Sequence, residues 1–514
     1  MGEAKQRAEL AKRAVVEAVG LETAGGRLQV HWDETAQATP HGQMAFFIEF
    51  LTLSGLFDRW VEDCPLSYVS PNGSSPREIL GTWLLSILAG HWRYAHVTAI
   101  RADGVNPRLL GMSGVVAEDT LRRALKAIDE PAGVQWLQCH IERSVRPLLN
   151  APWILDVDVT VKPLYGKQEG AVVGFNPKKP GRPSHAYHTY QVSGLRLMLG
   201  VDVLAGNQSH ANHTLPGLVG ILDQPAGEKR PKLVRGDAGL AGEPMLAALE
   251  ARAQPYLFKL RLTQNVKRYV ERVFWNADWH AAGQGWEGHD GSLRLTGWSR
   301  ARRVIILRRP LAGEALLADA AQGVLAFIEA DVPTKRYEYT VLVTDLPHET
   351  LSLAQLYRDR ADAENTFDEL KNQWGWGGFT THDLSRCRLS AMAVALVYNW
   401  WSLFVRLGNP GARLEAITSR PFLLAAVARR TTHAGAQQLT ITPQHGKAEE
   451  AKSMLTSIHA LLERFRQVAE QLRSRSVWQL ICEHIVATVA RFKPSTQLGL
   501  PPPASGVATA NCCF

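Results

Sequence analysis

The amino-acid sequence predicts a mixed α/β protein, in which a strand-rich centre lies between helical N-terminal and C-terminal regions. Three observations lead to this expectation. Apolar residues recur at helical spacing before residue 150, short β-branched runs begin at Trp153, and long helical patterns return from Leu353. Strands that alternate with helices are typical of α/β domains. The 514 residues, 46% of them hydrophobic, are enough for roughly two to four packed domains.

Residues 1–150 are predicted to form a helical, DNA-binding region. Helical spacing marks the segments 77–88 and 118–128, and proline and glycine residues separate the segments. The second segment carries Arg122 and Arg123, which would contact DNA if this helix belonged to a helix-turn-helix. The alternative is a basic helix face that only meets solvent.

Strand signals dominate residues 151–264. The run ILDVDVTV at 154–161 alternates or is β-branched throughout and predicts the first strand. Further strands are expected at 195–204, 232–235 and 256–260, and a helix is expected at 243–252. Residues 265–346 contain short β-rich runs separated by turn residues, and they predict a β-rich insertion subdomain.

The last third of the chain is predicted to be helical over 347–410 and again over 411–493. The most apolar stretch, 389–405, contains Asn399 and two tryptophans and is shorter than the roughly 20 residues of a membrane span. It is therefore predicted to be a buried helix, and no membrane is expected as a partner. Residues 494–514 are expected to form a flexible tail.

The net charge of the chain favours a polyanionic partner. The formal charge is +8 and the pI is about 9.2, which fits nucleic acid, although a merely basic soluble protein is the alternative. The N-terminal residues lack the apolar core of a secretory signal, and the six cysteines show no CxxC spacing. A cytoplasmic location is expected.

The segment YRDRADAENTFDELK carries the most specific pattern in the sequence. Tyr357, Glu364 and Lys371 lie seven residues apart, and Arg360 lies one helical turn before the glutamate. Because seven residues make nearly two turns, a single helix would present all four side chains along one stripe. The alternative is an exposed charge pair between Arg360 and Glu364 without a function.

The spacing Y-x2-R-x3-E-x6-K resembles the signature of a large group of bacterial insertion-sequence DDE transposases. This resemblance implies two further aspartates on earlier strands. Asp237 lies in LVRGDAGL, and Asp158 lies in ILDVDVT. Asp156 is the alternative to Asp158, because residues two apart on a strand point to the same side. Asp158 is preferred because it lies nearer the end of the strand.

The resemblance covers at least residues 153–401 and implies an RNase H-like catalytic core that the β-rich insertion interrupts. Asp158, Asp237 and Glu364 would be the catalytic residues and the ligands of two Mg²⁺ ions, with Mn²⁺ as a substitute. In-line phosphodiester chemistry uses two such cations about 4 Å apart, and oxygen donors suit them. His185 with His188 is a weaker alternative as a pair of soft-metal ligands.

The resemblance also implies which residues contact DNA. Tyr357, Arg360 and Lys371 would bind phosphates near the cleaved bond, since their side chains donate hydrogen bonds. The basic loop NPKKPGR would add Lys178, Lys179 and Arg182. One tryptophan of the insertion is expected to stack on a flipped base, with core packing as the alternative for each of four candidates: Trp275, Trp279, Trp286 and Trp298.

The resulting functional hypothesis is a transposase that cleaves DNA at the terminal repeats of its element and joins the ends to target DNA. Its partners would be double-stranded DNA, as terminal inverted repeats and as target, and a second copy of the chain. It would act in the cytoplasm of a bacterium, associated with the nucleoid. The alternatives are a non-catalytic DNA-binding derivative and an RNase H-like nuclease without strand transfer.

Overall fold

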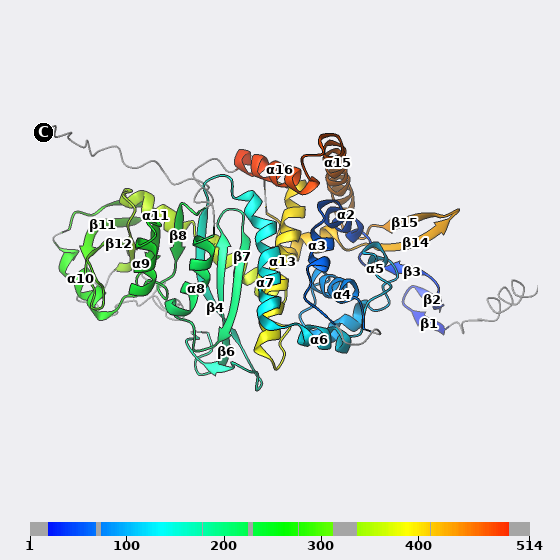
Figure 1. Ribbon diagram of the computed structural model, residues 1–514, viewed down its shortest axis with the longest axis horizontal. Helices are drawn as coiled ribbons and strands as arrows, with labels where there is room; N and C mark the ends of the chain where they lie inside the picture. The colour runs from blue at the N-terminus through cyan, green and yellow to red at the C-terminus, as the bar shows by residue number, and fades with distance from the viewer. Residues whose placement is uncertain are drawn as a thin grey trace, which may run out of the picture.

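The computed structural model describes residues 19–67, 73–176, 178–224, 230–275, 277–311, 337–411 and 413–492. They form an elongated molecule with a large sheet on one side and a helical body on the other (Figure 1). The predicted mixed α/β class is confirmed.

A ten-stranded sheet contains all the strands of the centre, and β4 (Ile154–Pro163) lies near its middle. On one side, β6 (Pro183–Val192) pairs antiparallel with β4, and β7 (Leu197–Ala205) pairs antiparallel with β6. On the other side, β8 (Leu233–Gly236) and β9 (Tyr256–Lys259) run parallel to β4. The four strands predicted in this part of the chain are confirmed.

Strand β6 is an element that the sequence pattern does not predict. All its residues except Pro183 are buried, so no alternation of polar and apolar residues marks it. Both of its histidines are buried and make hydrogen bonds inside the fold. His185 Nε2 lies 2.8 Å from the carbonyl oxygen of Glu169, and His188 Nδ1 lies 2.6 Å from Thr214 Oγ1.

The predicted β-rich insertion begins with a helix, α10 (Gln264–Phe274), and its strands continue the same sheet. Strand β13 (Tyr337–Thr344) pairs antiparallel with β9, and β12 (Arg302–Pro310) pairs with β13. Strands β11 (Trp286–Leu293) and β10 (His280–Gly283) complete this edge. The insertion is thereby tied to the strand that follows Asp237.

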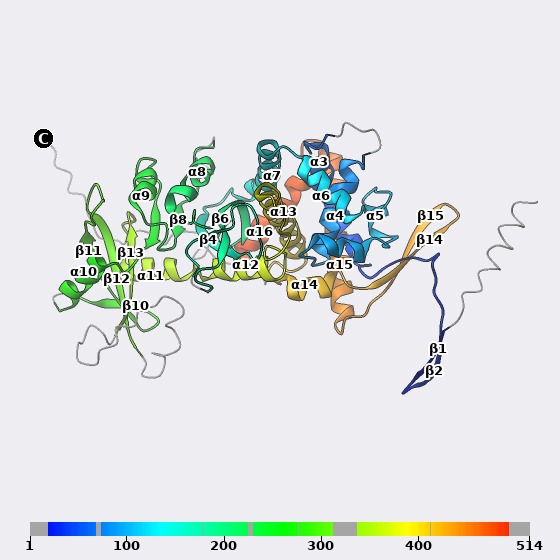
Figure 2. The same ribbon diagram turned by 90° about the horizontal axis from the view of Figure 1, so that it is seen from below.

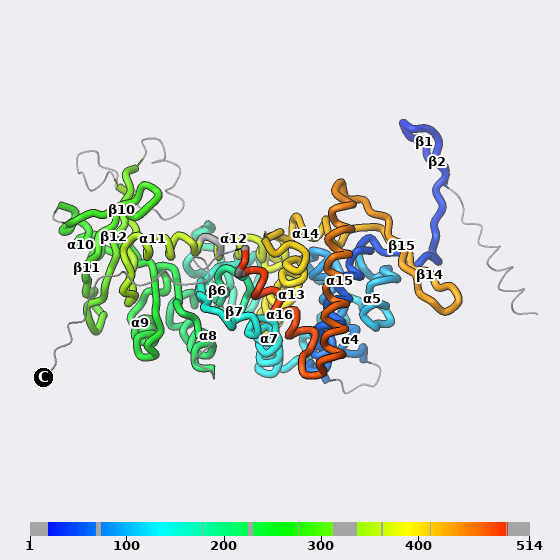
Figure 3. The backbone as a smooth tube through the Cα atoms, turned by 90° about the horizontal axis from the view of Figure 1, so that it is seen from above, coloured from blue at the N-terminus to red at the C-terminus, as the bar shows by residue number. Residues whose placement is uncertain are grey.

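Helices cover the two faces of the sheet in different ways (Figures 2 and 3). On one face lie α8 (Ala211–Leu222) and α9 (Glu243–Glu250), with α7 (Glu130–Val145) against β7. Along the other face run α11 (Thr350–Arg358) and α12 (Ala361–Asn372). This second face therefore carries the motif helices.

The apolar helix α13 (Leu384–Gly408) joins the sheet to the helical body. In the described part of the chain it is the one helix long and apolar enough to cross a membrane, but 89% of its most apolar 18-residue window is buried within the protein. Asn399 Nδ2 donates to the carbonyl oxygen of Met198 at 2.7 Å, and the amide of Met198 donates to Asn399 Oδ1 at 2.8 Å. The predicted buried helix is confirmed.

The helical body packs N-terminal and C-terminal helices around α13. Its core contains Trp60, which stacks on Trp136 with 5.6 Å between ring centroids and meets Trp400 of α13 edge-on at 5.6 Å. The N-terminal helices other than α7 are α2 (Met44–Ser54), α3 (Leu56–Glu62), α4 (Pro76–Leu88), α5 (Asn106–Leu109) and α6 (Glu118–Ala127). The C-terminal ones are α14 (Ala416–Leu423), α15 (Ala448–Leu472) and α16 (Val477–Phe492).

The terminal regions also contain strands that the helical expectation omits. These are β1 (Val19–Thr23), β2 (Gly26–Val30), β3 (Gln37–Thr39), β14 (Val427–His433) and β15 (Ala436–Thr442). The single helix expected over 353–373 is also wrong in part, because it is interrupted between Arg358 and Ala361. The predicted flexible tail, 494–514, lies outside the described residues.

Candidate active site

Asp158 and Asp237 occupy equivalent positions on two neighbouring parallel strands. Val157 of β4 and Gly236 of β8 form the last pair in the ladder, and the two aspartates are the next residues. Because neighbouring strands lie roughly 4.8 Å apart, their carboxylates are close to each other. Both residues line one pocket of about 550 Å³.

The sequence around Asp237 explains how this carboxylate reaches the pocket. A Cβ atom on Gly236 would lie 2.2 Å from Cε1 of Phe258, so only glycine lets β9 approach β8 here. The chain then turns at once, because the amide of Leu240 donates to the carbonyl oxygen of Asp237 at 3.0 Å. The turn leaves Asp237 at the end of a buried strand.

Asp156 and Asp158 both point toward the motif helices, but only Asp158 lines the pocket. Arg235 Nε donates to Asp156 Oδ1 at 2.6 Å and Arg235 Nη2 donates to Oδ2 at 2.8 Å. Each side chain of this pair is 1% exposed, and Arg235 also donates to the carbonyl oxygen of Leu356. Asp156 is therefore held in a buried ion pair that ties β4 and β8 to α11.

Arg360 and Tyr357 lie directly over the aspartates. Arg360 Nη2 donates to Asp158 Oδ2 at 2.5 Å, and its buried Nε has no hydrogen-bond partner among the described residues. Burial alone would lower the pKa of Arg360, but the charge of Asp158, together with Tyr357, Asp156 and Asp237, outweighs burial and raises it. Burial raises the pKa of the Tyr357 hydroxyl, and the neighbouring acidic groups add to this effect.

Glu364 lies one turn after Arg360 on α12 and is exposed. Burial raises the pKa of Asp158, Arg360 opposes this, and the charges of Asp237 and Glu364 raise it further. Asp237 and Glu364 are thus each close enough to act on Asp158. The three carboxylates do not converge on one point. The described residues contain no group of three or more His, Cys, Asp or Glu side chains placed to hold a metal ion.

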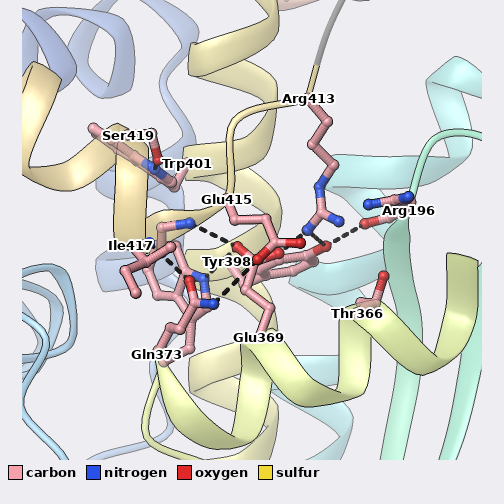
Figure 4. A network of polar contacts seen from close by, with 12 residues as sticks. Arg196, Thr366, Glu369, Gln373, Tyr398, Trp401, Arg413, Glu415, Ile417 and Ser419 are labelled. Carbon is pink, nitrogen blue, oxygen red and sulfur yellow. Dashed lines mark hydrogen bonds and ion pairs between the residues drawn. The ribbon is translucent and has the colours of Figure 1, made fainter.

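The opposite side of α12 is anchored by Glu369 (Figure 4). This buried carboxylate accepts hydrogen bonds from the indole of Trp374 at 3.1 Å and from the amide of Ala416 at 3.0 Å, and it pairs with Arg413. Arg413 Nη2 also donates to the hydroxyl of Tyr398 at 2.6 Å. The helix that carries Glu364 is therefore fixed to α13 and α14.

A family model described as Transposase DDE domain group 1 matches residues 73–463. The chain belongs to this family of transposases. A cryo-EM structure of a piggyBac transposase synaptic complex with hairpin DNA is similar to it, with 11% sequence identity over 92% of this chain and 87% of that chain and a TM-score of 0.37. A search of curated proteins found no match.

The predicted basic contacts of the transposase fall into separate groups. Burial lowers the pKa of Lys371 to about 8, and the charge of Lys178 adds to this, so these two lysines lie near each other. Lys179 and Arg182 instead flank the exposed ring of Tyr165, at 5.0 and 4.8 Å from its centroid. The loop thus presents cations beside an aromatic ring.

Arg122 and Arg123 do not lie on the elements that build the pocket. They are exposed on α6, which packs against α4 and the 3-10 helix η1 (Tyr94–Ile100). Arg122 Nη1 lies 3.6 Å from Glu118 Oε1, and Arg123 Nε donates to the carbonyl oxygen of Asp119 at 3.2 Å. Contact with DNA by these two residues stays a prediction.

The four tryptophans of the insertion differ in exposure. Trp279 covers Arg308 with 3.8 Å between the guanidinium carbon and the ring centroid, and Trp298 is buried against Arg302 at 4.9 Å. The ring centroid of Trp286 lies 5.0 Å from the guanidinium carbon of Arg309. Trp275 is 70% exposed, which leaves it as the most accessible ring of the four.

Lys259, Arg261 and Phe175 are among the pocket residues that were not predicted from the sequence of the transposase. Lys259 is the last residue of β9 and Arg261 lies two residues later, and because β9 runs parallel to β8 they meet the edge that holds Asp237. Their alternating basic pattern after a strand was a usable signal. Phe175, 68% exposed, also lines the pocket, and nothing in the sequence marks it.

Proposed function

We propose that this transposase is a cut-and-paste DNA transposase of the DDE type, with Asp158, Asp237 and Glu364 as its catalytic residues. The observation that carries the proposal is the equivalent placement of Asp158 and Asp237 on neighbouring parallel strands, in one pocket, beneath Arg360. The signature Y-x2-R-x3-E-x6-K supplies Glu364. We further propose that the core is RNase H-like, which the order β7-β6-β4-β8-β9 supports.

The donor atoms at this site suit Mg²⁺, with Mn²⁺ as a substitute. All three side chains offer carboxylate oxygens, which hard divalent cations prefer. Burial and the mutual repulsion of the carboxylates raise the pKa of Asp158, and a bound cation would relieve both effects. Two such cations would activate the attacking oxygen and stabilise the leaving oxygen of a phosphodiester. Glu364 is proposed as the third ligand.

The protein's own side chains would bind and orient the DNA backbone. Arg360 favours the ionised form of Asp158 and offers further N–H groups to a phosphate, and the hydroxyl of Tyr357 offers another donor. Lys371 and Lys178 lie close together, so a phosphate between them would remove their mutual repulsion. These contacts fix the position of the scissile bond and carry no sequence information.

The proposed partners are the terminal inverted repeats of the element, target DNA and a second copy of the chain that holds the other end. The gene's own flanking DNA is the natural substrate for a test. A plasmid carrying the gene with both flanks would be incubated with the protein and Mg²⁺, and excision of the segment would be followed on gels.

Wild-type protein is expected to excise the segment, and Asp237→Asn is expected to lose cleavage by at least about a hundredfold while still binding the DNA. Asp368→Asn is the matched control, because Asp368 is an exposed aspartate one turn after Glu364 on α12. It should cleave like the wild type. Binding without cleavage by the wild-type protein would favour a non-catalytic derivative and end the proposal.

A further inference from the structure

A small sheet projects from the helical body on the side away from the ten-stranded sheet (Figures 1, 2 and 3). It consists of β15, β14 and β3, in that order, and we call it the projecting sheet. The hairpin between β14 and β15 turns at Ala434 and Gly435, which have φ values of 48° and 80°. Two consecutive residues with positive φ form the turn that keeps the twist of two paired strands.

The base of the projecting sheet is fixed to the helical body. The amide of Gly42 donates to the carbonyl oxygen of Ala426 at 2.7 Å, and the amide of Ala426 donates to that of Pro40 at 3.1 Å. Thr39 Oγ1 donates to Asp103 Oδ2 at 2.7 Å. The hairpin is therefore held in a defined direction at its base.

One face of the projecting sheet is exposed along its whole length. The strand register places nine residues on this face, and all are exposed: Ala38, Val427, Arg429, Thr431, His433, Ala436, Gln438, Thr440 and Thr442. The opposite face is buried at its base, at Ala428 and Thr39. The exposed face is thus polar and flat, and it has many hydrogen-bonding groups.

The projecting sheet is also basic. Its strands contain Arg429 on the exposed face and Arg430 on the opposite face, and no aspartate or glutamate. Nε and Nη1 of Arg430 are buried and have no hydrogen-bond partner among the described residues. Asp33 lies within electrostatic range of Arg429, but its Oδ1 already accepts hydrogen bonds from the hydroxyl and the amide of Thr35, at 2.7 and 3.0 Å.

We infer that the exposed face of the projecting sheet binds duplex DNA in the major groove, away from the catalytic pocket. This inference rests on the proposed function, since it adds a second DNA contact to the same enzyme. Two strands lie about 5 Å apart, and the major groove is about 12 Å wide and admits a two-stranded ribbon. The threonine and glutamine side chains can meet base edges, and Arg429 can meet a phosphate or a guanine.

A second copy of the chain is the competing partner, because it could pair with the free edge of β15. An edge strand can pair with another strand through its unpaired backbone groups. A second copy would bring the same positive charge to the contact, however, whereas DNA brings the opposite charge. The positive charge of the projecting sheet therefore favours DNA.

The decisive variant is Thr440→Glu in the full-length protein. Thr440 lies directly opposite Arg429 in the strand register, so the new carboxylate would neutralise Arg429 without weakening the hairpin. The affinity for a random-sequence duplex of 30 base pairs, measured by fluorescence anisotropy, is expected to fall about tenfold. The matched control is Thr432→Glu, which adds the same charge on the other face near the tip and should change the affinity by about twofold or less.

Arg429→Ala provides a second variant with an independent readout. Loss of one phosphate contact should lower the slope of log affinity against log salt by about 0.9. Equal affinities and equal slopes for the wild type, Thr440→Glu and Arg429→Ala would overturn the inference. So would a loss of self-association by Thr440→Glu in sedimentation equilibrium with unchanged DNA affinity, because the occupant would then be a second copy.

The catalytic proposal is separated from this inference by a cleavage assay on the same proteins. Thr432→Glu should keep metal-dependent cleavage of plasmid DNA, Thr440→Glu should lose cleavage only in proportion to its weaker DNA binding, and Asp237→Asn should lose cleavage while keeping the wild-type duplex affinity. A wild-type protein that binds through the projecting sheet but never cleaves would contradict the proposed function and leave the DNA-binding inference supported.

Discussion

Replacing Asp156 with asparagine is expected to lower the free energy of unfolding by about 3–5 kcal/mol, which is the usual result when one partner of a buried ion pair is removed. Both side chains of the pair with Arg235 are 1% exposed, and both oxygens of Asp156 are bonded. Asparagine would leave the guanidinium buried without its counter-charge.

The same substitution at Asp158 should have a smaller effect on stability, about 1–2 kcal/mol, and a larger one on activity. The asparagine oxygen can still accept the hydrogen bond from Arg360, and the charge of Asp237 remains close to that guanidinium. Asp158→Asn is therefore expected to fold and to lose cleavage, whereas Asp156→Asn should cleave in proportion to its folded fraction.

Urea unfolding of the two variants, followed by circular dichroism, measures these differences. Asp156→Asn combined with Arg235→Gln is the control, since removal of both partners should cost less than the sum of the single changes by about 2 kcal/mol. Equal destabilisation by the two aspartate variants would refute the assignment of Asp156 to structure and Asp158 to catalysis, as would full cleavage activity in Asp158→Asn.

Two further predictions concern α12. Glu369→Gln should destabilise the protein by about 3 kcal/mol and reduce cleavage, because Glu369 anchors the helix through Arg413 and the amide of Ala416. Glu364→Gln is its control, and this change at an exposed site should alter stability by no more than about 0.5 kcal/mol while abolishing cleavage. Lys371 has its pKa lowered from 10.5 to about 8, so its unfavourable contribution to stability is absent above pH 10.5, develops as the pH falls from 10.5 to 8, and is complete below pH 8. Lys371→Met should therefore raise the free energy of unfolding at pH 7 by at most about 3 kcal/mol and have little effect near pH 11. Unfolding curves at both pH values test this, and a gain independent of pH would contradict it.

The elements predicted from the sequence are those whose own residues determine them. The run ILDVDVTV is β-branched and becomes β4, and the fixed spacing from Tyr357 to Lys371 brings Tyr357, Arg360 and Glu364 close to Asp158. The interruption of the motif helix leaves no signal in the sequence. Asp359 and Arg360 keep helical backbone angles there, so the interruption needs no helix-breaking residue.

The remaining elements depend on partners that are distant in the sequence. Strand β6 is buried between β4 and β7, and its histidines make hydrogen bonds to Glu169 and Thr214, which lie outside the strand, so no local pattern records its burial. The projecting sheet is rich in threonine, glutamine and arginine, and its few large apolar residues do not mark its strands as half-buried along their length. The separate roles of Asp156 and Asp158 likewise depend on Arg235, which lies 79 residues after Asp156.

The central claim is that Asp158, Asp237 and Glu364 catalyse both cleavage and joining of DNA. The most direct measurement offers the protein a pre-cleaved element end with a free 3′-hydroxyl, together with a target plasmid and Mg²⁺ or Mn²⁺, and records joined products by gel and sequencing. Wild-type protein should join the end to the target, and Asp158→Asn, Asp237→Asn and Glu364→Gln should each fail, while Asp368→Asn joins normally. Joining by any of the three carboxylate variants at the wild-type rate, or cleavage by the wild type without any joined product, would contradict the account.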